Sequence, residues 1–447
     1  MERPVADPPG QRQSTRERRL RHFTRCGGRV IGRVRPMTSA RGTTVVGIIL
    51  AGGEGKRLYP LTRDRAKPAV PFGGRYRIID IVLSNFVNSG IYKLSVITQY
   101  KAGSLMQHLA RGWQLAPQMG HYVAPVPPAM NLGPRFFEGS ADAVLQNLDV
   151  IENERPTHVC VFGADHIYKM DVGQMLRFHI ERDADATVAC IPVPARDAGG
   201  LGVVECDAVQ RVTNFLEKPT IKADAEGTRL ASMGLYIFRA GVLTRAITAD
   251  ADRRDSKHDF GRDILPSLVG TGRLFAYDFS TNEVPGMREQ ERGYWRDIGT
   301  VDAYWDASQD LVSVSPRFSL YNSEWPIYSA YYPSPPAKFV FSDREQNRVG
   351  IATDSMVSDG CIISGGHVDR SILGPRVRVN SFASVGESML FDDVEVGRRA
   401  RVRRAIVDKG VVIPPGLTIG YDPDEDRRRF TVSERGIVVV PKGARLG

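Results

Sequence analysis

The sequence predicts an α/β domain with a mostly parallel sheet, followed by a parallel β-helix. Two observations lead to this fold class. Up to about residue 315, strongly apolar runs alternate with helix-length amphipathic segments. Beyond that point, aliphatic residues recur every five or six positions, a period typical of hexapeptide-repeat coils. A chain of 447 residues has room for two or three domains of this kind.

Residues 1–43 precede the predicted fold and carry most of the net charge. They contain eleven Arg, no Lys and three acidic residues, whereas residues 44–447 hold 49 basic and 48 acidic side chains. The total of +9 therefore gives little support to a nucleic-acid partner. We expect this segment to be disordered. It is compatible with an organellar transit peptide, with a basic tail that binds a polyanion, or with a start upstream of the functional one at Met37.

Membrane insertion and secretion are not expected. No apolar stretch reaches the roughly 18 residues that cross a bilayer, and arginines interrupt the N-terminus where a secretory signal needs an apolar core. The five cysteines contain no C-x-x-C pair, which argues against a disulfide framework or a structural zinc site. We therefore expect a cytoplasmic protein.

Residues 44–315 are expected to form the α/β domain. Their continuous apolar runs are typical of parallel strands buried on both faces. The clearest of these runs are Val45–Leu50, Leu94–Thr98, His158–Gly163 and Ala186–Val193. Between strands, the segment 140–154 has the length of a helix, and four of its apolar residues can share one face: Ala143, Leu145, Leu148 and Ile151. Five prolines between residues 316 and 336 then predict a linker, which we place at 316–340.

Residues 341–447 are predicted to form the β-helix. Eleven aliphatic residues are spaced 6, 5, 6, 6, 5, 6, 6, 5, 6 and 6 positions apart, so that a 17-residue unit recurs. Three inward residues per unit is what a three-sided coil requires. The predicted inward residues are Ile362, Val368, Leu373, Val379, Val385, Leu390, Val396, Val402, Val407, Ile413 and Ile419.

A glycine-rich loop follows the first predicted strand. Gly52, Gly53 and Gly55 allow the backbone to approach a phosphate closely and to present N–H groups to it. The loop matches neither the Walker A motif nor the G-x-G-x-x-G spacing of dinucleotide sites, and alone it is compatible with a structural turn. Arg57 and Lys67 follow it and can offset the charge of a triphosphate.

Two aspartates are candidates for a magnesium site. Asp165 emerges at the end of the apolar run His158–Gly163, where ligands bind in open α/β sheets. Asp297, in YWRDIGT, can complete the site, because carboxylates and substrate phosphates are the usual surroundings of Mg²⁺. Each residue on its own is equally compatible with a helix cap or a loop.

The segment NFLEKPT suggests a sugar-phosphate site. Glu217 suits sugar hydroxyls and Lys218 suits a phosphate as a compact point charge. A surface charge pair before a turn is the structural alternative.

Taken together, these motifs resemble the bacterial glucose-1-phosphate adenylyltransferase family, also called ADP-glucose pyrophosphorylases. The resemblance covers about residue 44 to the end. It is carried by the segments GGEGKRLYPLT, RAKPAVPFGGRYRIIDIVLSN, VITQYK, GSADAVLQNLDVI, FGADHIYKMD, FLEKP, SMGLYIF, HDFGRDI and YWRDIGTVDAYW.

This resemblance implies a Rossmann-like nucleotidyltransferase domain and a left-handed β-helix that serves regulation and oligomerisation. It implies synthesis of ADP-glucose and diphosphate from ATP and glucose 1-phosphate, on the route to glycogen or another α-glucan. It further implies Mg²⁺ as cofactor, allosteric control by sugar phosphates, and a homotetramer.

The resemblance also assigns roles to individual residues. Asp165 and Asp297 would hold Mg²⁺, and Arg57 and Lys67 would contact the phosphates of ATP. Lys218 would bind the sugar phosphate, and the glucose pocket would be lined by Glu217, Ser232 and Gly202. Gln99 and Gly139 would contact adenine. The other predicted substrate contacts are Gly52, Gly53, Gly55, Phe137 and Asp142.

The chain departs from the family pattern near the substrate and effector sites. Phe137 and Glu138 stand before the GSADA motif, where many members have a tyrosine, so an aromatic ring is kept and a hydroxyl is lost. Asp64 takes the place of a lysine that helps to bind an activating sugar phosphate in the enterobacterial type, and Pro71 replaces a histidine. Three arginines remain as candidate effector ligands: Arg65, Arg77 and Arg429.

Two rival functions stay open at this level. A related nucleotidyltransferase carries an acyltransferase site on its β-helix, but such a site is expected to use a histidine base, and His367 is the only histidine in residues 316–447. A non-catalytic scaffold of the same architecture has no need for the combination of Arg57, Lys67 and Asp165.

Overall fold

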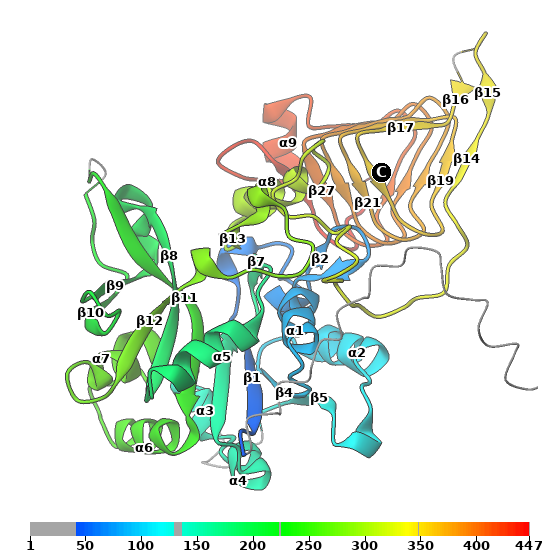
Figure 1. Cartoon of the computed structure of the whole chain (residues 1–447). Helices are drawn as coiled ribbons and strands as arrows, with labels where there is room; N and C mark the ends of the chain where they lie inside the picture. The colour runs from blue at the N-terminus through cyan, green and yellow to red at the C-terminus, as the bar shows by residue number, and fades with distance from the viewer. Residues whose placement is uncertain (1–41, 129–135, 223–224, 347, 447) are drawn as a thin grey trace, which may run out of the picture. The chain divides into compact units, whose positions relative to one another are not determined.

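The computed structural model describes residues 42–128, 136–222, 225–346 and 348–446, which Figure 1 traces from blue to red. The expectation of a disordered segment at residues 1–43 lies almost wholly outside the described residues. Across the described ranges, no helix has the length and apolar character needed to cross a membrane.

A mixed sheet, nine-stranded within the described residues, forms the framework of the first domain. Its core is the parallel group β6 (His158–Gly163), β1 (Val45–Ala51), β4 (Lys93–Thr98) and β5 (Tyr122–Val126), in that order. The long strand β11 (Thr228–Arg239) pairs antiparallel with β6 and with β8 (Ala186–Pro194). Beyond it lie β9 (Gly202–Cys206), β10 (Val212–Glu217) and β12 (Leu274–Asp278). The predicted α/β class is confirmed, and all four predicted strands are present.

Helices cover both faces of this sheet, as the alternating pattern predicts. On β1, Ile48 packs into one apolar cluster and Ile49 into another, because successive strand residues point to opposite faces. The helices are α1 (Ile78–Asn88), α2 (Gly103–Gly112), α3 (Ser140–Leu145), α4 (Asp149–Glu154), α5 (Val172–Glu181), α6 (Ala240–Ala251), α7 (Leu265–Leu268) and α8 (Val301–Leu311).

The prediction of one continuous helix over residues 140–154 is wrong. The structure has two short helices there, α3 and α4, joined by a turn at residues 146–148. The Asn147 side chain donates to the carbonyl of Ala143, and Gln146 donates to Asp142. Such local side-chain hydrogen bonds compete with the helix and favour a break.

Two short ribbons carry residues of functional interest. One pairs β7 (His166–Tyr168) with β13 (Trp295–Asp297), antiparallel, so that His166 faces Asp297. The other pairs β2 (Pro71–Phe72) with β3 (Tyr76–Arg77).

The second domain is a parallel β-helix with three sheets, visible in Figure 1 as the stack of coils that contains β19, β21 and β27. Successive coils pair at a 17-residue interval, as in His367 with Ser384 and Ser384 with Arg401. The first sheet holds β14 (Lys338–Val340), β19 (Ile362–Ser364), β22 (Arg378–Val379), β25 (Glu395–Val396) and β28 (Val412–Ile413). The second holds β17 (Ile351–Thr353), β20 (His367–Asp369), β23 (Ser384–Gly386), β26 (Arg401–Arg403) and β29 (Thr418–Ile419). The third holds β18 (Met356–Val357), β21 (Ile372–Leu373), β24 (Met389–Leu390), β27 (Ala405–Val407), β31 (Val438–Val440) and β30 (Thr431–Val432).

The predicted inward positions are buried with one exception. Ile362 is only half-buried, and Ile363 points inward in its place and pairs with Val379. The first interval is therefore 16 residues instead of 17. Two adjacent isoleucines satisfy the hydrophobic pattern equally well, so only the strand register distinguishes them.

The strand β14 lies within the segment that we predicted as linker, and the hairpin of β15 (Ser342–Asp343) and β16 (Arg348–Val349) follows it. The last helix, α9, spans Pro423–Arg429.

Candidate active site

The glycine loop after β1 lines a cavity of about 340 Å³. Gly55 has φ +64°, and a Cβ there would lie 3.0 Å from Thr62 and 3.2 Å from Lys67, so both backbone conformation and space favour glycine. Gly53, Arg57, Lys67 and Asp165 line the same cavity. The structure therefore brings the predicted phosphate-binding residues together around one opening.

Lys67 lies between the two predicted metal-binding aspartates. Its Nζ donates to Asp165 Oδ2 at 2.9 Å and to Asp297 Oδ1 at 3.1 Å, and its side chain is 8% exposed. Burial alone would lower the pKa of Lys67, but the two carboxylates hold it above its ordinary value. Lys67 is thus a fixed cation within the site and joins residues that are far apart in the sequence.

Asp165 and Asp297 are placed side by side by the β7–β13 ribbon. Asp165 directly precedes β7, and Asp297 ends β13 opposite His166. Although burial opposes ionisation, His166 and Lys67 hold the pKa of Asp165 well below its usual range. Asp165 is therefore an ionised carboxylate at neutral pH.

The same residues fit a divalent cation. Asp165, His166 and Asp297 each offer one ligand atom, and these atoms lie within 4.8 Å of one another. Lys67 bonds to Oδ2 of Asp165, whereas Oδ1 faces His166 Nε2 at 3.5 Å. Carboxylate oxygens beside a phosphate-binding loop are a suitable donor set for Mg²⁺. Arg57 Nη2 lies 4.0 Å from Asp297 Oδ2 and is largely exposed, so it can reach a bound anion.

A second cavity, of about 290 Å³, shares Leu50 and Gly53 of its lining with the first. It is lined by the two residues predicted to contact adenine, Gln99 and Gly139, and by three other predicted substrate contacts, Gly52, Gly53 and Phe137. Gln99 Nε2 donates to the carbonyl of Phe137 at 3.5 Å. A Cβ on Gly139 would lie 2.2 Å from the carbonyl oxygens of Lys257 and His258, so only glycine fits there.

Asp142 is placed differently from its predicted role in substrate binding. It is buried, and its Oδ2 accepts hydrogen bonds from the Glu138 backbone N–H and from Gln146 Nε2, both at 2.9 Å. These contacts shape the loop that carries Phe137 and Gly139. In the structure Asp142 therefore supports the loop at the start of α3.

The predicted sugar-site residues gather around the end of β10. Gly202 and Glu217 are directly paired across β9 and β10, and a Cβ on Gly202 would lie 3.0 Å from Glu217 Oε2. Lys218 follows β10 and places its Nζ 3.1 Å from Glu217 Oε1, with a largely exposed side chain. Ser232 lies on β11 at a register irregularity. These residues form one polar group near the edge of the sheet.

Sequence reasoning assigned no role to the segment 258–264, although its letters HDFGRDI carry part of the resemblance. A Cβ on Gly261 would lie 2.5 Å from Glu217 Oε2, and Asp259 accepts a hydrogen bond from Ser140 Oγ at 2.8 Å. The segment Phe260–Ile264 forms a π-helical turn, a conformation that is frequent at functional sites. It connects the sugar-site residues to the loop before α3.

The three candidate effector arginines differ in availability. Arg65 is 4% exposed and forms a bidentate ion pair with Asp408. Arg77 Nη1 donates to the carbonyl and hydroxyl of Ser104 at 2.8 and 2.9 Å. Arg429 ends α9 and faces Glu425 and the carbonyl of Leu446.

Lys409 adds a cation to this region that sequence reasoning missed. Its Nζ contacts Asp392 at 2.8 Å. Burial lowers its pKa, and Arg77 and Arg65 lower it further while Asp392 opposes them. The β-helix thus contributes a lysine to the cationic group around Arg65 and Arg77.

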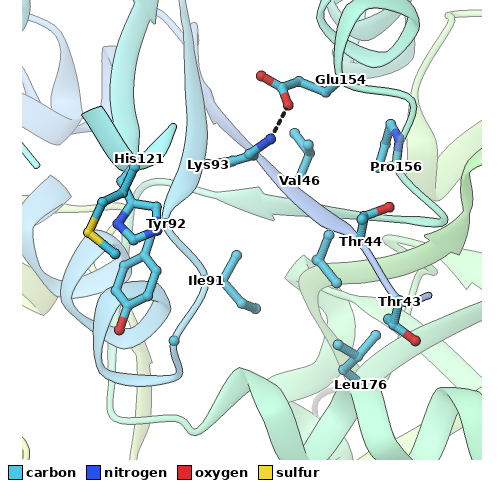
Figure 2. Close-up of a pocket in the computed structure, with 13 residues that line it drawn as sticks. Thr43, Thr44, Val46, Ile91, Tyr92, Lys93, His121, Glu154, Pro156 and Leu176 are labelled. Carbon is cyan, nitrogen blue, oxygen red and sulfur yellow. Dashed lines mark hydrogen bonds and ion pairs between the residues drawn. The ribbon is translucent and has the colours of Figure 1, made fainter. Parts of the chain in front are cut away.

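A third cavity, of about 180 Å³, lies at the amino ends of β1 and β4 and contains none of the predicted site residues (Figure 2). It is lined mainly by apolar side chains such as Ile91 and Leu176, with the Lys93–Glu154 ion pair beside it. Because β1 and β4 are parallel, this edge is opposite to the one from which the glycine loop emerges.

Comparisons with known proteins show the family of this chain. The nucleotidyl transferase family model matches residues 46–314, and a model for the GlmU-like C-terminal hexapeptide matches residues 335–440. A glucose-1-phosphate adenylyltransferase of Anaeromyxobacter sp. (strain Fw109-5) is 54% identical over 407 residues, which cover 90% of this chain and 99% of that protein. The chain belongs to the glucose-1-phosphate adenylyltransferase family.

Further relatives support this assignment. The enzymes of the same name from Anaeromyxobacter dehalogenans (strain 2CP-C) and Cutibacterium acnes (strain DSM 16379 / KPA171202) are 55% and 50% identical, over 90% and 89% of this chain and 98% and 97% of theirs. As a member of the glucose-1-phosphate adenylyltransferase family, the protein is a nucleotidyltransferase, and the resemblance in the sequence is confirmed.

Proposed function

We propose that this protein transfers the adenylyl group of ATP to α-D-glucose 1-phosphate, giving ADP-glucose and diphosphate. An oxygen of the sugar phosphate forms a bond to the α-phosphorus of ATP, and the bond from that phosphorus to the bridging oxygen of the β-phosphate breaks. The electron pair leaves with diphosphate. The sugar phosphate is already an anion, so no general base is needed.

The arrangement of Lys67 between Asp165 and Asp297 carries this proposal. It puts a buried cation and two carboxylates beside the glycine loop and Arg57. Catalysis of such a transfer depends mainly on positioning and on neutralising phosphate charge. Asp165 and Asp297 would hold Mg²⁺, which when bound supplies charge neutralisation at the phosphates. Lys67 orients the two carboxylates, and Arg57 binds the phosphates of ATP from the exposed side.

Substrate selection would be divided between the two other groups of residues. The cavity with Gln99 and Phe137 receives the base, where Phe137 offers a ring face without a hydroxyl. Glu217 accepts hydrogen bonds from the glucose hydroxyls, and Lys218 binds the sugar phosphate. The segment 258–264 would link the two groups, because Asp259 accepts a hydrogen bond from Ser140 and Gly261 lies close to Glu217.

Regulation by sugar phosphates forms the second part of the proposal. The cationic group of Arg65, Arg77 and Lys409 would attract an anionic effector. Arg77 and Lys409 would make the contacts, because Arg65 is only 4% exposed and is held by a bidentate ion pair with Asp408, whereas Lys409 is 22% exposed. The β-helix would also serve assembly into a homotetramer, and ADP-glucose would serve glycogen or another α-glucan.

The experiment measures ADP-glucose and diphosphate formed from ATP, glucose 1-phosphate and Mg²⁺ by the full-length protein. Equal amounts of the two products are expected. Asp165→Ala should lower kcat by about 100-fold or more, since it removes a charged group from the reacting centre. Asp255→Ala, at an exposed position, is the matched control. Near-normal turnover in Asp165→Ala would contradict the proposal.

A further inference from the structure

The β7–β13 ribbon that carries the two aspartates is too short to hold its own geometry. Each strand contributes three residues, and two-stranded pairings are only marginally stable on their own. A metal site requires its ligands to be held to within about half an ångström. The ribbon must therefore be fixed by contacts beyond its own hydrogen bonds.

A buried ion pair lies at the end of the ribbon away from Asp165. Lys169 directly follows β7, and its Nζ donates to Glu291 Oε1 at 2.8 Å; each side chain is 3% exposed. Glu291 lies four residues before Trp295, where β13 begins. The pair therefore ties together the chain segments that continue from the two strands.

The Glu291 carboxylate has further partners that fix its position. Oε1 also accepts the Ser319 backbone N–H at 3.0 Å, and Oε2 accepts the backbone N–H and Nε of Arg288, both at 3.2 Å. Although burial opposes ionisation, Lys169 and these donors lower the pKa of Glu291, which keeps it charged. Lys169 is thus held against a carboxylate that cannot turn away.

A second polar contact holds the same end of β7. Asn85, on α1, donates to the carbonyl of Tyr168 and accepts the Met170 backbone N–H, both at 3.1 Å. Trp325 Nε1 donates to the same Asn85 oxygen. The residues on either side of Lys169 are therefore fixed to the helix layer.

We propose that Lys169 and Glu291 are positioning residues that hold the β7–β13 ribbon, and through it Asp165 and Asp297, in the geometry that binds the divalent cation. Neither residue lines the cavity at the glycine loop or the cavity with Gln99. A buried ion pair of this kind is costly to desolvate and contributes little net stability, so its value lies in the single arrangement that it imposes. This inference rests on the proposed metal site at Asp165 and Asp297.

The test measures Mn²⁺ binding to the full-length protein by electron paramagnetic resonance, without substrates. Lys169→Met keeps the apolar stem and leaves Glu291 with its Ser319 and Arg288 donors. We expect it to raise the Kd for Mn²⁺ about tenfold, the size of effect seen when a group that orients metal ligands is lost. Lys93→Met breaks the Lys93–Glu154 pair at the opposite edge of the sheet (Figure 2) and should leave the Kd within about twofold of wild type.

A double-mutant cycle separates positioning from general destabilisation. Asp297→Asn removes a proposed ligand and should weaken Mn²⁺ binding. Adding Lys169→Met to it should raise the Kd by clearly less than the tenfold expected in the wild-type background, because one of the two carboxylates that the ion pair positions is already lost. The positioning role would be overturned if the two substitutions raised the Kd for Mn²⁺ by independent factors that multiply in the double variant. A wild-type Kd in Lys169→Met would overturn it as well. If Lys169→Met does not fold, Glu291→Gln, checked by its melting curve, takes its place in the same cycle. Unchanged binding in Asp297→Asn would instead overturn the metal site itself, and the inference with it.

Discussion

Arg65 and Asp408 form a bidentate ion pair between residues 343 positions apart. Arg65 Nη1 and Nη2 lie 2.9 and 2.8 Å from the two carboxylate oxygens, and the side chains are 4% and 2% exposed. The pair joins the segment after the glycine loop to a coil of the β-helix. Arg65 lies two residues before Lys67, the lysine of the candidate active site.

Breaking this ion pair should destabilise the protein strongly. Arg65→Ala or Asp408→Ala leaves one buried charge without its partner, and we expect a loss of about 3–5 kcal/mol in the free energy of unfolding. Arg65→Met combined with Asp408→Leu should recover most of it. Denaturant unfolding measures the effect. Asp393→Ala, which breaks the exposed pair with Arg376, is the control and should cost less than about 1 kcal/mol. An equal cost for the buried and exposed pairs would refute the account.

Lys218→Ala should raise the KM for glucose 1-phosphate. The side chain is largely exposed, with Glu217 as its neighbour, and so is free to bind an anion. Losing one charge-assisted contact of about 1.5–3 kcal/mol corresponds to roughly a 10- to 100-fold higher KM, with the KM for ATP changed less than about twofold. Steady-state kinetics with each substrate varied in turn provides the measurement. Lys222→Ala, at an exposed lysine four residues on, serves as control. A selective rise in the KM for ATP would place Lys218 at the wrong substrate.

Lys409→Gln should weaken the response to an activating sugar phosphate. The substitution removes the cation that the β-helix contributes beside Arg77 and Arg65. We expect the half-activating concentration of the effector to rise about tenfold, an effect larger than any change in the unstimulated rate. Activation curves with fructose 1,6-bisphosphate, fructose 6-phosphate and glucose 6-phosphate measure this, with Arg435→Gln, at an exposed arginine paired with Asp306, for comparison. Unaltered activation by every effector that stimulates the wild type would remove Lys409 from the site.

His179 should make the stability fall as the pH falls. Burial, together with His158 and Arg239, lowers the pKa of His179 from its ordinary value of 6.5 to about 3. Between these two values the unfolded chain binds a proton that the folded chain does not. The free energy of unfolding should therefore decline by about 1.4 kcal/mol per pH unit from pH 6.5 towards pH 3 on account of this residue. His179→Gln should flatten this slope, whereas His367→Gln, at an exposed position, should keep it. An unchanged slope in His179→Gln would mean that other groups cause the decline.

The sequence predicted the fold where the pattern has one physical solution. The 17-residue unit requires three inward residues per coil, and only the ambiguous pair Ile362 and Ile363 was assigned in the wrong order. Asp165 could be predicted to lie at the ligand-binding edge because it comes just after the end of a parallel strand, β6. The break of the helix at Asn147 depended on side-chain hydrogen bonds that propensity does not register.

Long-range polar contacts were the part that sequence reasoning could not supply. Lys67 follows a glycine loop, and nothing in its neighbourhood indicates that it lies between Asp165 and Asp297. Glu291 lies outside the motifs of the resemblance, and Lys169 lies within FGADHIYKMD with nothing there to indicate its partner, because a buried ion pair is defined by a partner that only the fold provides. Charged residues of this kind look like surface residues until their burial is known.

Nucleotide preference tests most directly whether this chain adenylylates glucose 1-phosphate. Diphosphate release from glucose 1-phosphate is measured with ATP, UTP, dTTP and GTP in parallel at equal concentration. We expect the highest kcat/KM with ATP. A clear preference for UTP, dTTP or GTP would contradict it.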